Sequence, residues 1–184
     1  MSISFIVPTI GRESLRRTIA SIETRPGDEI LLVGDVALRL REYAFIAERP
    51  ELRVIDCPPG GDYGHHERNV AMETAKGDYL SSMDDDDEYM PGARALLESA
   101  MHGAPSIFRM QYHNDQGPTL WRDKEIRVGN CGTPCVFAPN MPERLVPWGH
   151  HYCGDFDFMS GMKWAPHEIS WREEVICIVR PDHD

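Results

Sequence analysis

The stretch that decides the fold is residues 66–91, which read HERNVAMETAKGDYLSSMDDDDEYMP. Its first part, 66–76, has the periodicity of a helix, and Gly77 stands where a helix C-terminal cap is expected. The next residues, 79–83, predict a buried strand. Five consecutive acidic residues, 84–88, follow that strand directly. A helix, a strand and an acidic turn are therefore expected in direct succession.

Toward the N-terminus the same alternation of strand and helix repeats. Apolar runs predict buried strands, and helical spacing predicts the segments between them. The strands are expected at 3–7, 30–33 and 52–55, and the helices at 15–22 and 38–47. Such alternation is typical of βαβ units, so we expect an α/β fold with a mostly parallel sheet flanked by helices.

Toward the C-terminus the pattern is less regular. Apolar spacing predicts one more helix after Pro91. Strands are expected at 106–112, 119–121, 135–138 and 174–179, with a hairpin turn at 114–118. A length of 184 residues fits a single compact domain. Within it, residues 1–91 are predicted to form a nucleotide-binding half, and residues 92–184 the half that selects what else binds.

The composition and the net charge argue against some classes of function. The chain is 41% hydrophobic and 27% charged, as in a soluble globular protein, and its formal net charge is −11. A net negative charge argues against broad nucleic-acid binding, which needs a basic surface. No apolar run reaches the length of a membrane span, and the N-terminus lacks a signal-like pattern, so a cytoplasmic location without membrane binding is expected.

The five cysteines are an odd number and lie scattered along the chain, which favours free, buried or partly buried thiols. Cys131 and Cys135 are close enough in sequence to suggest a zinc site. No second close pair completes such a site, so structural zinc is disfavoured. The adjacent pairs His65/His66 and His150/His151 lie beside glycines and are more typical of loops than of ligand sets.

Open α/β sheets bind ligands beyond the carboxyl ends of their strands. The residues that follow the four predicted strands are Pro8-Thr9, Gly34-Asp35, Asp56 and the acidic run 84–88, so three of the four places carry a carboxylate. Closely spaced carboxylates suit Mn²⁺ or Mg²⁺, which would also hold phosphate oxygens. The alternative is a solvated acidic turn that caps the helix after Pro91.

The stretch 66–91 resembles the central signature of family 2 glycosyltransferases with the GT-A fold. In that family an Arg-Asn helix and a Gly-Asp turn lead into a strand that ends in a DxD motif. Residues 6–12, IVPTIGR, match the family's opening segment, although Ile10-Gly11 stands where Tyr-Asn or a similar pair is more usual. The resemblance covers residues 3–91 and continues more loosely to the C-terminus.

The resemblance implies a Rossmann-like nucleotide-sugar site. Pro8 and Thr9 would contact the nucleotide, Asp35 would bind the base, usually uracil, and Arg68 would lie near the nucleotide and its phosphates. Asp84 and Asp86 match the two ends of DxD.

In the DxD pattern, Asp84 lies near the ribose or sugar and Asp86 coordinates the metal, Mn²⁺ or Mg²⁺. Asp85 is a candidate for either role, because four successive aspartates allow either register.

A second match lies at 153–158, CGDFDF, which resembles the family segment Gly-Glu-Asp-Trp-Asp-Leu. Asp155 takes the place of the general base, with Asp157 the next choice, whereas Gly154 replaces the usual glutamate. The alternative is an acid at a helix N-terminus. Near the end of the chain, His183 is a candidate metal or phosphate ligand by the same resemblance.

These residues predict a metal-dependent glycosyltransferase that moves a sugar from a UDP-sugar to an acceptor hydroxyl, with inversion. The alternatives are a nucleotidyltransferase, a haloacid-dehalogenase-type phosphatase, which would need an aspartate on the first strand, and a non-catalytic nucleotide-sugar-binding module. The acceptor is not specified. All four tryptophans fall in the second half and suit an acceptor site or the core. A homodimer is compatible with the sequence.

Overall fold

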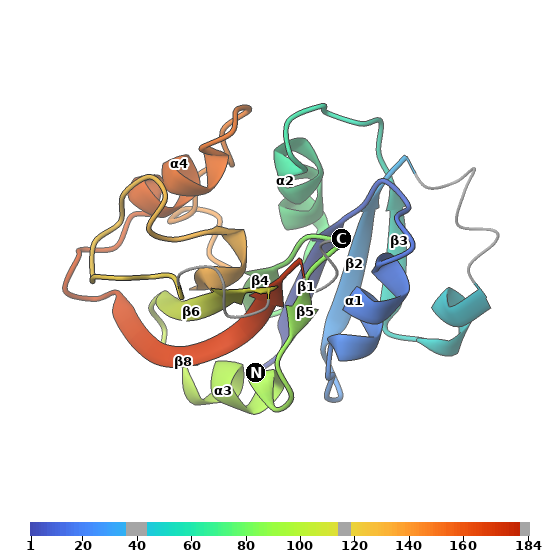
Figure 1. Ribbon diagram of the computed structural model, residues 1–184, viewed down its shortest axis with the longest axis horizontal. Helices are drawn as coiled ribbons and strands as arrows, with labels where there is room; N and C mark the ends of the chain where they lie inside the picture. Colours follow the sequence, from blue (N-terminus) through green and yellow to red (C-terminus); the bar gives the residue numbers. More distant parts are fainter. Residues whose placement is uncertain (36–43, 114–118, 181–184) are drawn as a thin grey trace.

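The computed structural model describes residues 1–35, 44–113 and 119–180, in which eight strands form one sheet of order β3-β2-β1-β4-β7-β6-β8-β5 (Figure 1). The strands are β1 (Ile3–Pro8), β2 (Glu29–Gly34), β3 (Leu52–Asp56), β4 (Tyr79–Ser82), β5 (Glu88–Tyr89), β6 (Ser106–Tyr112), β7 (Val136–Pro139) and β8 (Ser170–Val179). The helices are α1 (Leu15–Ser21), α2 (His65–Thr74), α3 (Ala93–Ser99) and α4 (Gly154–Gly161), with 3₁₀ turns at Ala44–Glu48 and Thr133–Cys135.

The N-terminal half of the sheet is parallel. Strands β3, β2, β1 and β4 run in one direction, with Val7 opposite Leu32 and Phe5 opposite Ser81. All residues of β1, β2 and β4 are buried, as expected of strands covered on both faces. Because the strands are parallel, the loops after β1, β2 and β4 all lie at one edge of the sheet.

The C-terminal half adds antiparallel pairs, so the whole sheet is mixed. Strand β7 runs antiparallel to both β4 and β6, and β5 runs antiparallel to β8, whereas β6 and β8 are parallel. The long strand β8 curves around this half (Figure 1). Helices α2 and α4 lie on one side of the sheet and α3 on the other (Figure 1).

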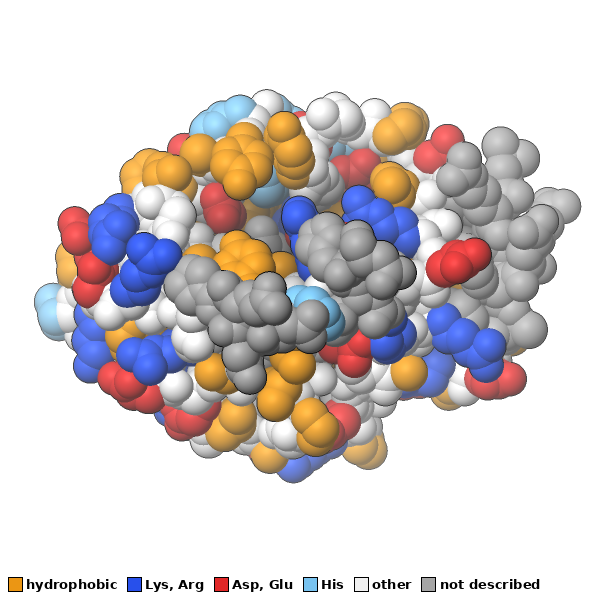
Figure 2. All heavy atoms as spheres, in the orientation of Figure 1, with side chains coloured by type: hydrophobic (Ala, Val, Ile, Leu, Met, Phe, Trp, Pro, Cys, Tyr) orange, Lys and Arg blue, Asp and Glu red, His pale blue; other side chains and the backbone are white. Residues whose placement is uncertain are grey.

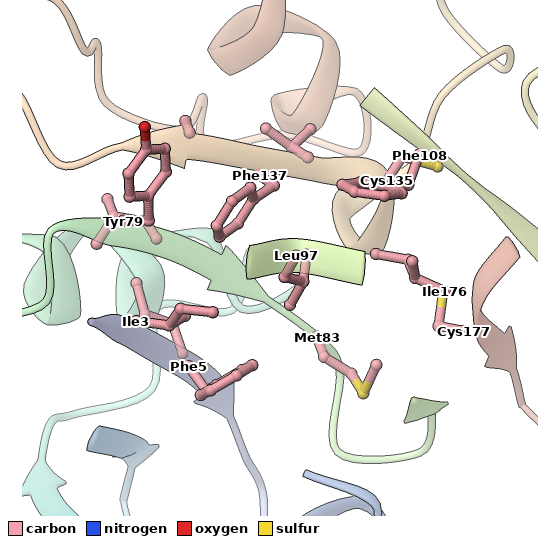
Figure 3. Close-up of a cluster of buried hydrophobic side chains, with 14 of the residues drawn as sticks. Ile3, Phe5, Tyr79, Met83, Leu97, Phe108, Cys135, Phe137, Ile176 and Cys177 are labelled. Atoms are coloured by element: carbon pink, nitrogen blue, oxygen red, sulfur yellow. The ribbon is translucent and has the colours of Figure 1, made fainter. Parts of the chain in front are cut away.

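The core continues across the junction of the two halves. Figure 3 shows Phe5 and Tyr79 from the parallel strands close to Phe137 from β7 and Leu97 from α3. The rings of Tyr79 and Phe137 stack with centroids 4.8 Å apart. Burial of such aromatic and aliphatic surface dominates the stability of a domain of this size.

Several local predictions need correction. Residues 119–121 do not form a strand: Leu120 makes a single bridge to Met110. Helix α2 ends at Thr74 and its C-cap is Ala75, so Gly77 is not the cap. The glycine is required instead by close packing on β1, since a Cβ there would lie 2.4 Å from the Ser4 nitrogen.

Other predictions fall partly outside the described residues. The expected helix 38–47 overlaps the undescribed segment 36–43, and residues 44–48 form a 3₁₀ turn. The expected hairpin turn 114–118 lies outside the described residues. The cysteines are free thiols, four of them buried and Cys153 half-buried. Within the described ranges, no helix is both long and apolar enough to pass through a bilayer.

Candidate functional site

An open pocket of about 230 Å³ lies at the edge where β1 and β4 end. Its wall combines the loop after β1, the glycine-containing loop that precedes α2, the first aspartates of the acidic run, and Arg180. These segments are far apart in the chain and meet because β1 and β4 are neighbouring parallel strands. The pocket therefore lies where ligands bind in open α/β sheets.

The acidic run does not present all its side chains to the pocket in the same way. Asp85 is buried, and its Oδ2 accepts hydrogen bonds from the Thr9 hydroxyl at 2.6 Å and from the Ile10 N–H at 3.1 Å. Its Oδ1 accepts one from Arg12 Nη1 at 2.8 Å. These hydrogen bonds hold the loop after β1 in place. Thr9 also lines the pocket, although its hydroxyl already donates to Asp85.

The other three aspartates form the oxygen-rich cluster of the site. Asp84, Asp86 and Asp87 offer carboxylate oxygens that all lie within 4.8 Å of one another. Burial raises the pKa of Asp86 and of Asp87, and the neighbouring Asp84 adds to both shifts. Hard oxygen donors at this spacing fit Mn²⁺ or Mg²⁺. From the sequence, Asp86 was predicted to bind the metal and Asp84 to lie near the ribose or sugar, whereas Asp87, which belongs to the same cluster, was given no specific role.

Arg68 lies behind the pocket wall, with only 1% of its surface exposed. Its Nη2 donates to Asp84, its Nε donates to the Ser82 hydroxyl at 3.0 Å, and its Nη1 donates to the Tyr63 carbonyl at 2.9 Å. The guanidinium also lies over the Trp148 ring, 5.3 Å from its centroid. Arg68 therefore positions Asp84 at the end of β4 and links α2 to the second half of the chain.

Asp155, from the second half of the chain, is not among the residues that line the pocket, but the charges of Arg68 and Asp84 act on it. It lies in the first turn of α4, where its Oδ1 accepts the Phe156 N–H at 2.7 Å. Burial raises the pKa of Asp155, the charge of Arg68 opposes that shift, and the charge of Asp84 adds to it. Asp157, by contrast, pairs with His151 at 2.6 Å in an exposed position. A half-buried carboxylate with a raised pKa suits a general base better than an exposed one.

Gly154 departs from the family pattern for a steric reason. A Cβ at this position would lie 2.2 Å from the Gly149 carbonyl oxygen and 2.8 Å from His65 Nε2. The His65 ring stacks on Trp148, with centroids 5.7 Å apart and planes at 9°. Trp148 in turn stacks on Phe158 of α4 at 4.3 Å. This arrangement leaves no room for a side chain at position 154.

The two histidine pairs are not equivalent, and the first does not lie in a loop, because His65 and His66 begin α2. Burial lowers the pKa of His65 to about 4, so the ring is neutral. Its Nδ1 lies 3.4 Å from Arg68 Nη1, which can only donate, and the ring proton therefore belongs on Nε2. His150 lies at the rim of the pocket instead, where its Nδ1 is 2.5 Å from Oδ2 of the pocket residue Asp62.

The rim joins the two halves of the chain through aromatic rings. Tyr63 precedes α2 and Tyr152 precedes α4, and their rings meet edge to face at 5.4 Å although both are exposed. Figure 2 shows histidine and hydrophobic side chains gathered at this upper edge of the molecule. Tyr63 has a left-handed backbone, with φ of 62°, which is uncommon for a residue other than glycine.

Glu67 is a pocket residue that sequence reasoning missed. Its Oε1 accepts the Gly60 N–H at 3.1 Å, whereas its Oε2 is buried and has no hydrogen-bond partner within the described part of the chain. Glu67 lines the pocket beside the loop before α2. Its position next to Arg68 in the signature stretch was the signal that could have identified it.

Of the remaining candidates, Pro8 lines the pocket and Asp35 is not among its lining residues. Pro8 packs against Gly64, where a Cβ would be 2.8 Å from the Pro8 side chain. Asp35 is exposed and directly follows β2, next to Gly34, which packs on the Thr9 carbonyl. His183 lies outside the described residues.

The family model for glycosyl transferase family 2 matches residues 4–165. The chain belongs to this family. A search of curated protein sequences gave no match. Among solved structures, S. aureus TarS 1–349 is similar with a TM-score of 0.75 and 18% identity, over 97% of this chain and 60% of that one. The same protein in complex with UDP gives a TM-score of 0.71 at 17% identity, again over 97% and 60%.

A third structure, TarS 1–349 with UDP-GlcNAc, gives 0.69 at 14% identity over 100% of this chain and 60% of that one. The chain thus spans about 60% of TarS 1–349, and 36% of the longer TarS chain. The prediction of a family 2 glycosyltransferase domain with the GT-A fold is confirmed. The parallel strands and the acidic turn of this family 2 domain match what its sequence predicted.

Proposed function

We propose that the protein transfers a sugar from a UDP-sugar to an acceptor hydroxyl with inversion, in a metal-dependent reaction. One observation carries this proposal: the buried Arg68 links the oxygen cluster of Asp84, Asp86 and Asp87 to the half-buried Asp155, because it donates to Asp84 and its charge acts on Asp155. The first feature suits a nucleoside diphosphate with its cation, and the second suits proton transfer from an acceptor.

The donor assignment is supported by the fold. TarS, which shares the fold, is described in complex with UDP and with UDP-GlcNAc. On this chain, Pro8 and Thr9 would contact the nucleoside from the pocket wall, and Asp35 would bind the base. Asp84, Asp86 and Asp87 would hold Mn²⁺ or Mg²⁺, which supplies Lewis-acid stabilisation of the leaving diphosphate.

Asp155 is assigned the general-base role. It would accept the proton of the acceptor hydroxyl as that oxygen attacks the anomeric carbon. The bond from this carbon to the diphosphate oxygen breaks, and the nucleoside diphosphate leaves with the electron pair. Attack on the face opposite the leaving group inverts the configuration. The raised pKa of Asp155 supports this role, because a stronger base takes the proton more readily.

The test is calorimetric titration of the protein with UDP, GDP, CDP and ADP, each with Mn²⁺ and with EDTA. We expect tight binding of UDP with Mn²⁺ and loss of that binding in Asp86→Ala. The matched control is Glu73→Ala, an exposed acid on α2 outside the cluster, which should bind UDP normally. Absence of nucleotide binding in the wild type, or UDP binding that ignores both the metal and Asp86, would refute the proposal.

A further inference from the structure

The positively charged Arg12 pairs with two aspartates of the acidic run 84–88. Its Nη1 lies 2.8 Å from Asp85 Oδ1 and 2.9 Å from Asp86 Oδ2. The two carboxylates differ in exposure, since the Asp85 side chain is 4% exposed and the Asp86 side chain 25%. Arg12 itself is 45% exposed and lines the pocket. A single, partly exposed guanidinium therefore pairs with one buried acid and one accessible acid.

The two aspartates that pair with Arg12 depend on it to different degrees. Asp85 is also held by the Thr9 hydroxyl and the Ile10 N–H, so its position does not depend on Arg12. Asp86 has weaker support, because the next cation, Arg180, has its Nε 3.9 Å from the same Oδ2. Asp86 also belongs to the oxygen cluster that fits a divalent cation. Arg12 and such a cation would thus bind the same carboxylate, that of Asp86. Two positive charges on one carboxylate repel each other.

We propose that Arg12 is a positioning residue that couples metal binding to nucleotide binding. It holds Asp86 while no divalent cation is bound, leaves Asp86 when one binds, and then turns to the diphosphate in the same pocket. The proposal rests on the proposed function above, because it assumes a nucleoside diphosphate in this pocket.

The chemistry of arginine supports this exchange. A guanidinium binds two oxygens of a diphosphate in a fork geometry as readily as it binds carboxylates. Only the long exposed side chain has to rotate, because Asp85 remains fixed by the loop. The metal releases the guanidinium from Asp86, and the diphosphate then binds it. Each ligand therefore strengthens the binding of the other, by the same factor.

The experiment measures Mn²⁺ binding by electron paramagnetic resonance of the free ion, with and without UDP, in the wild type and three variants. In Arg12→Gln we expect Mn²⁺ alone to bind about tenfold more tightly and UDP with Mn²⁺ to bind about tenfold more weakly. The coupling between the two ligands should therefore fall by about tenfold, and only the part that comes from direct contact between metal and diphosphate should remain. Arg12→Lys keeps the charge and should bind Mn²⁺ alone nearly as weakly as the wild type. Arg16→Gln removes the same charge from an exposed residue of α1 and should behave like the wild type.

The outcomes separate the two proposals. Unchanged or weaker Mn²⁺ binding in Arg12→Gln, or intact coupling to UDP, would overturn the role of Arg12 while leaving the donor site in place. Equal effects of Arg12→Gln and Arg16→Gln would also overturn it, because net charge alone would then explain them. Thermal unfolding of each variant controls for folding. If Arg12→Gln misfolds, Arg12→Lys decides: lysine lacks the fork geometry of arginine, so UDP with Mn²⁺ should bind more weakly than in the wild type, and unchanged UDP binding would overturn the role of Arg12. A wild type that binds neither Mn²⁺ nor UDP would refute the proposed function itself.

Discussion

The imidazole of His65 and the indole of Trp148 lie face to face, with centroids 5.7 Å apart and planes at 9°. This stack joins α2, which carries Arg68, to the loop that leads into α4, which carries Asp155. Two hydrogen bonds between the Asn69 side chain and the Trp148 backbone, at 2.8 and 3.0 Å, hold the same junction. The relative position of the acidic cluster and Asp155 therefore depends on Trp148.

Trp148→Ala should destabilise the protein by about 3–5 kcal/mol, because it removes a buried ring that packs on both His65 and Phe158. The measurement is urea-induced unfolding followed by circular dichroism. Tyr152→Ala is the matched control, since this exposed ring lies in the same loop and should cost less than about 1 kcal/mol. Equal losses in the two variants would show that the junction does not depend on Trp148.

Gly154→Ala should destabilise the protein although it lies in a helix. Replacing glycine by alanine within a helix normally gains up to about 1 kcal/mol. Here the new Cβ would meet the Gly149 carbonyl at 2.2 Å, so we expect a loss of about 1–3 kcal/mol instead. Ser160→Ala, on an exposed position of α4, is the control. A stabilised Gly154→Ala would contradict the close approach of the two backbones.

His65 predicts a pH dependence of stability. Its pKa is about 4 in the folded protein against an ordinary value of 6.5, so the unfolded chain binds more protons between these values. The free energy of unfolding should therefore be highest above pH 6.5 and fall toward pH 4, by up to about 3 kcal/mol from this group. His65→Phe should flatten the curve between pH 7 and pH 5, whereas His167→Gln, an exposed histidine, should not. An unchanged slope in His65→Phe would exclude His65 as its source.

Glu67→Gln should weaken UDP binding by about tenfold or more. The Oε2 of Glu67 is a buried acceptor without a partner among the described residues, and a ligand N–H or O–H could satisfy it. Isothermal titration with UDP would measure the loss, and Mn²⁺ binding to the aspartate cluster should be unaffected. Glu73→Gln, an exposed acid on the same helix, should leave UDP affinity unchanged. If both variants bind UDP equally well, Glu67 has no role in the donor site.

The sequence predicts the elements whose signals are local. Strands β1, β2 and β4 are continuous apolar runs, and α2 has helical spacing, so each was expected close to its observed bounds. The two-residue strand β5 was missed because it exists only through pairing with β8. The order of β7, β6 and β8 likewise depends on contacts between distant segments.

The site divides in the same way. The aspartate run and its place after a strand are local features, and they identify the cluster. The direction of each side chain is not local: Asp85 turns toward Thr9 because the loop after β1 supplies its donors, and Asp87 turns toward the backbone N–H of Arg180. The His65 ring packs against Gly154, which is far away in the chain, and no pattern in either segment predicts this contact.

Asp155→Asn should keep donor binding and lose sugar transfer. The amide has nearly the size of the carboxylate and can still accept the Phe156 N–H, but it cannot take a proton from the acceptor. We expect the transfer rate to fall by about 10²–10⁴-fold while UDP affinity in the presence of Mn²⁺ stays within about twofold. Transfer from UDP-GlcNAc is measured as product formed with a panel of hydroxyl acceptors. Asp157→Asn, which removes an exposed acid two residues away, is the control and should retain most of the rate. If Asp157→Asn loses transfer and Asp155→Asn does not, the base is Asp157, and the burial that raises the pKa of Asp155 serves only the packing of α4.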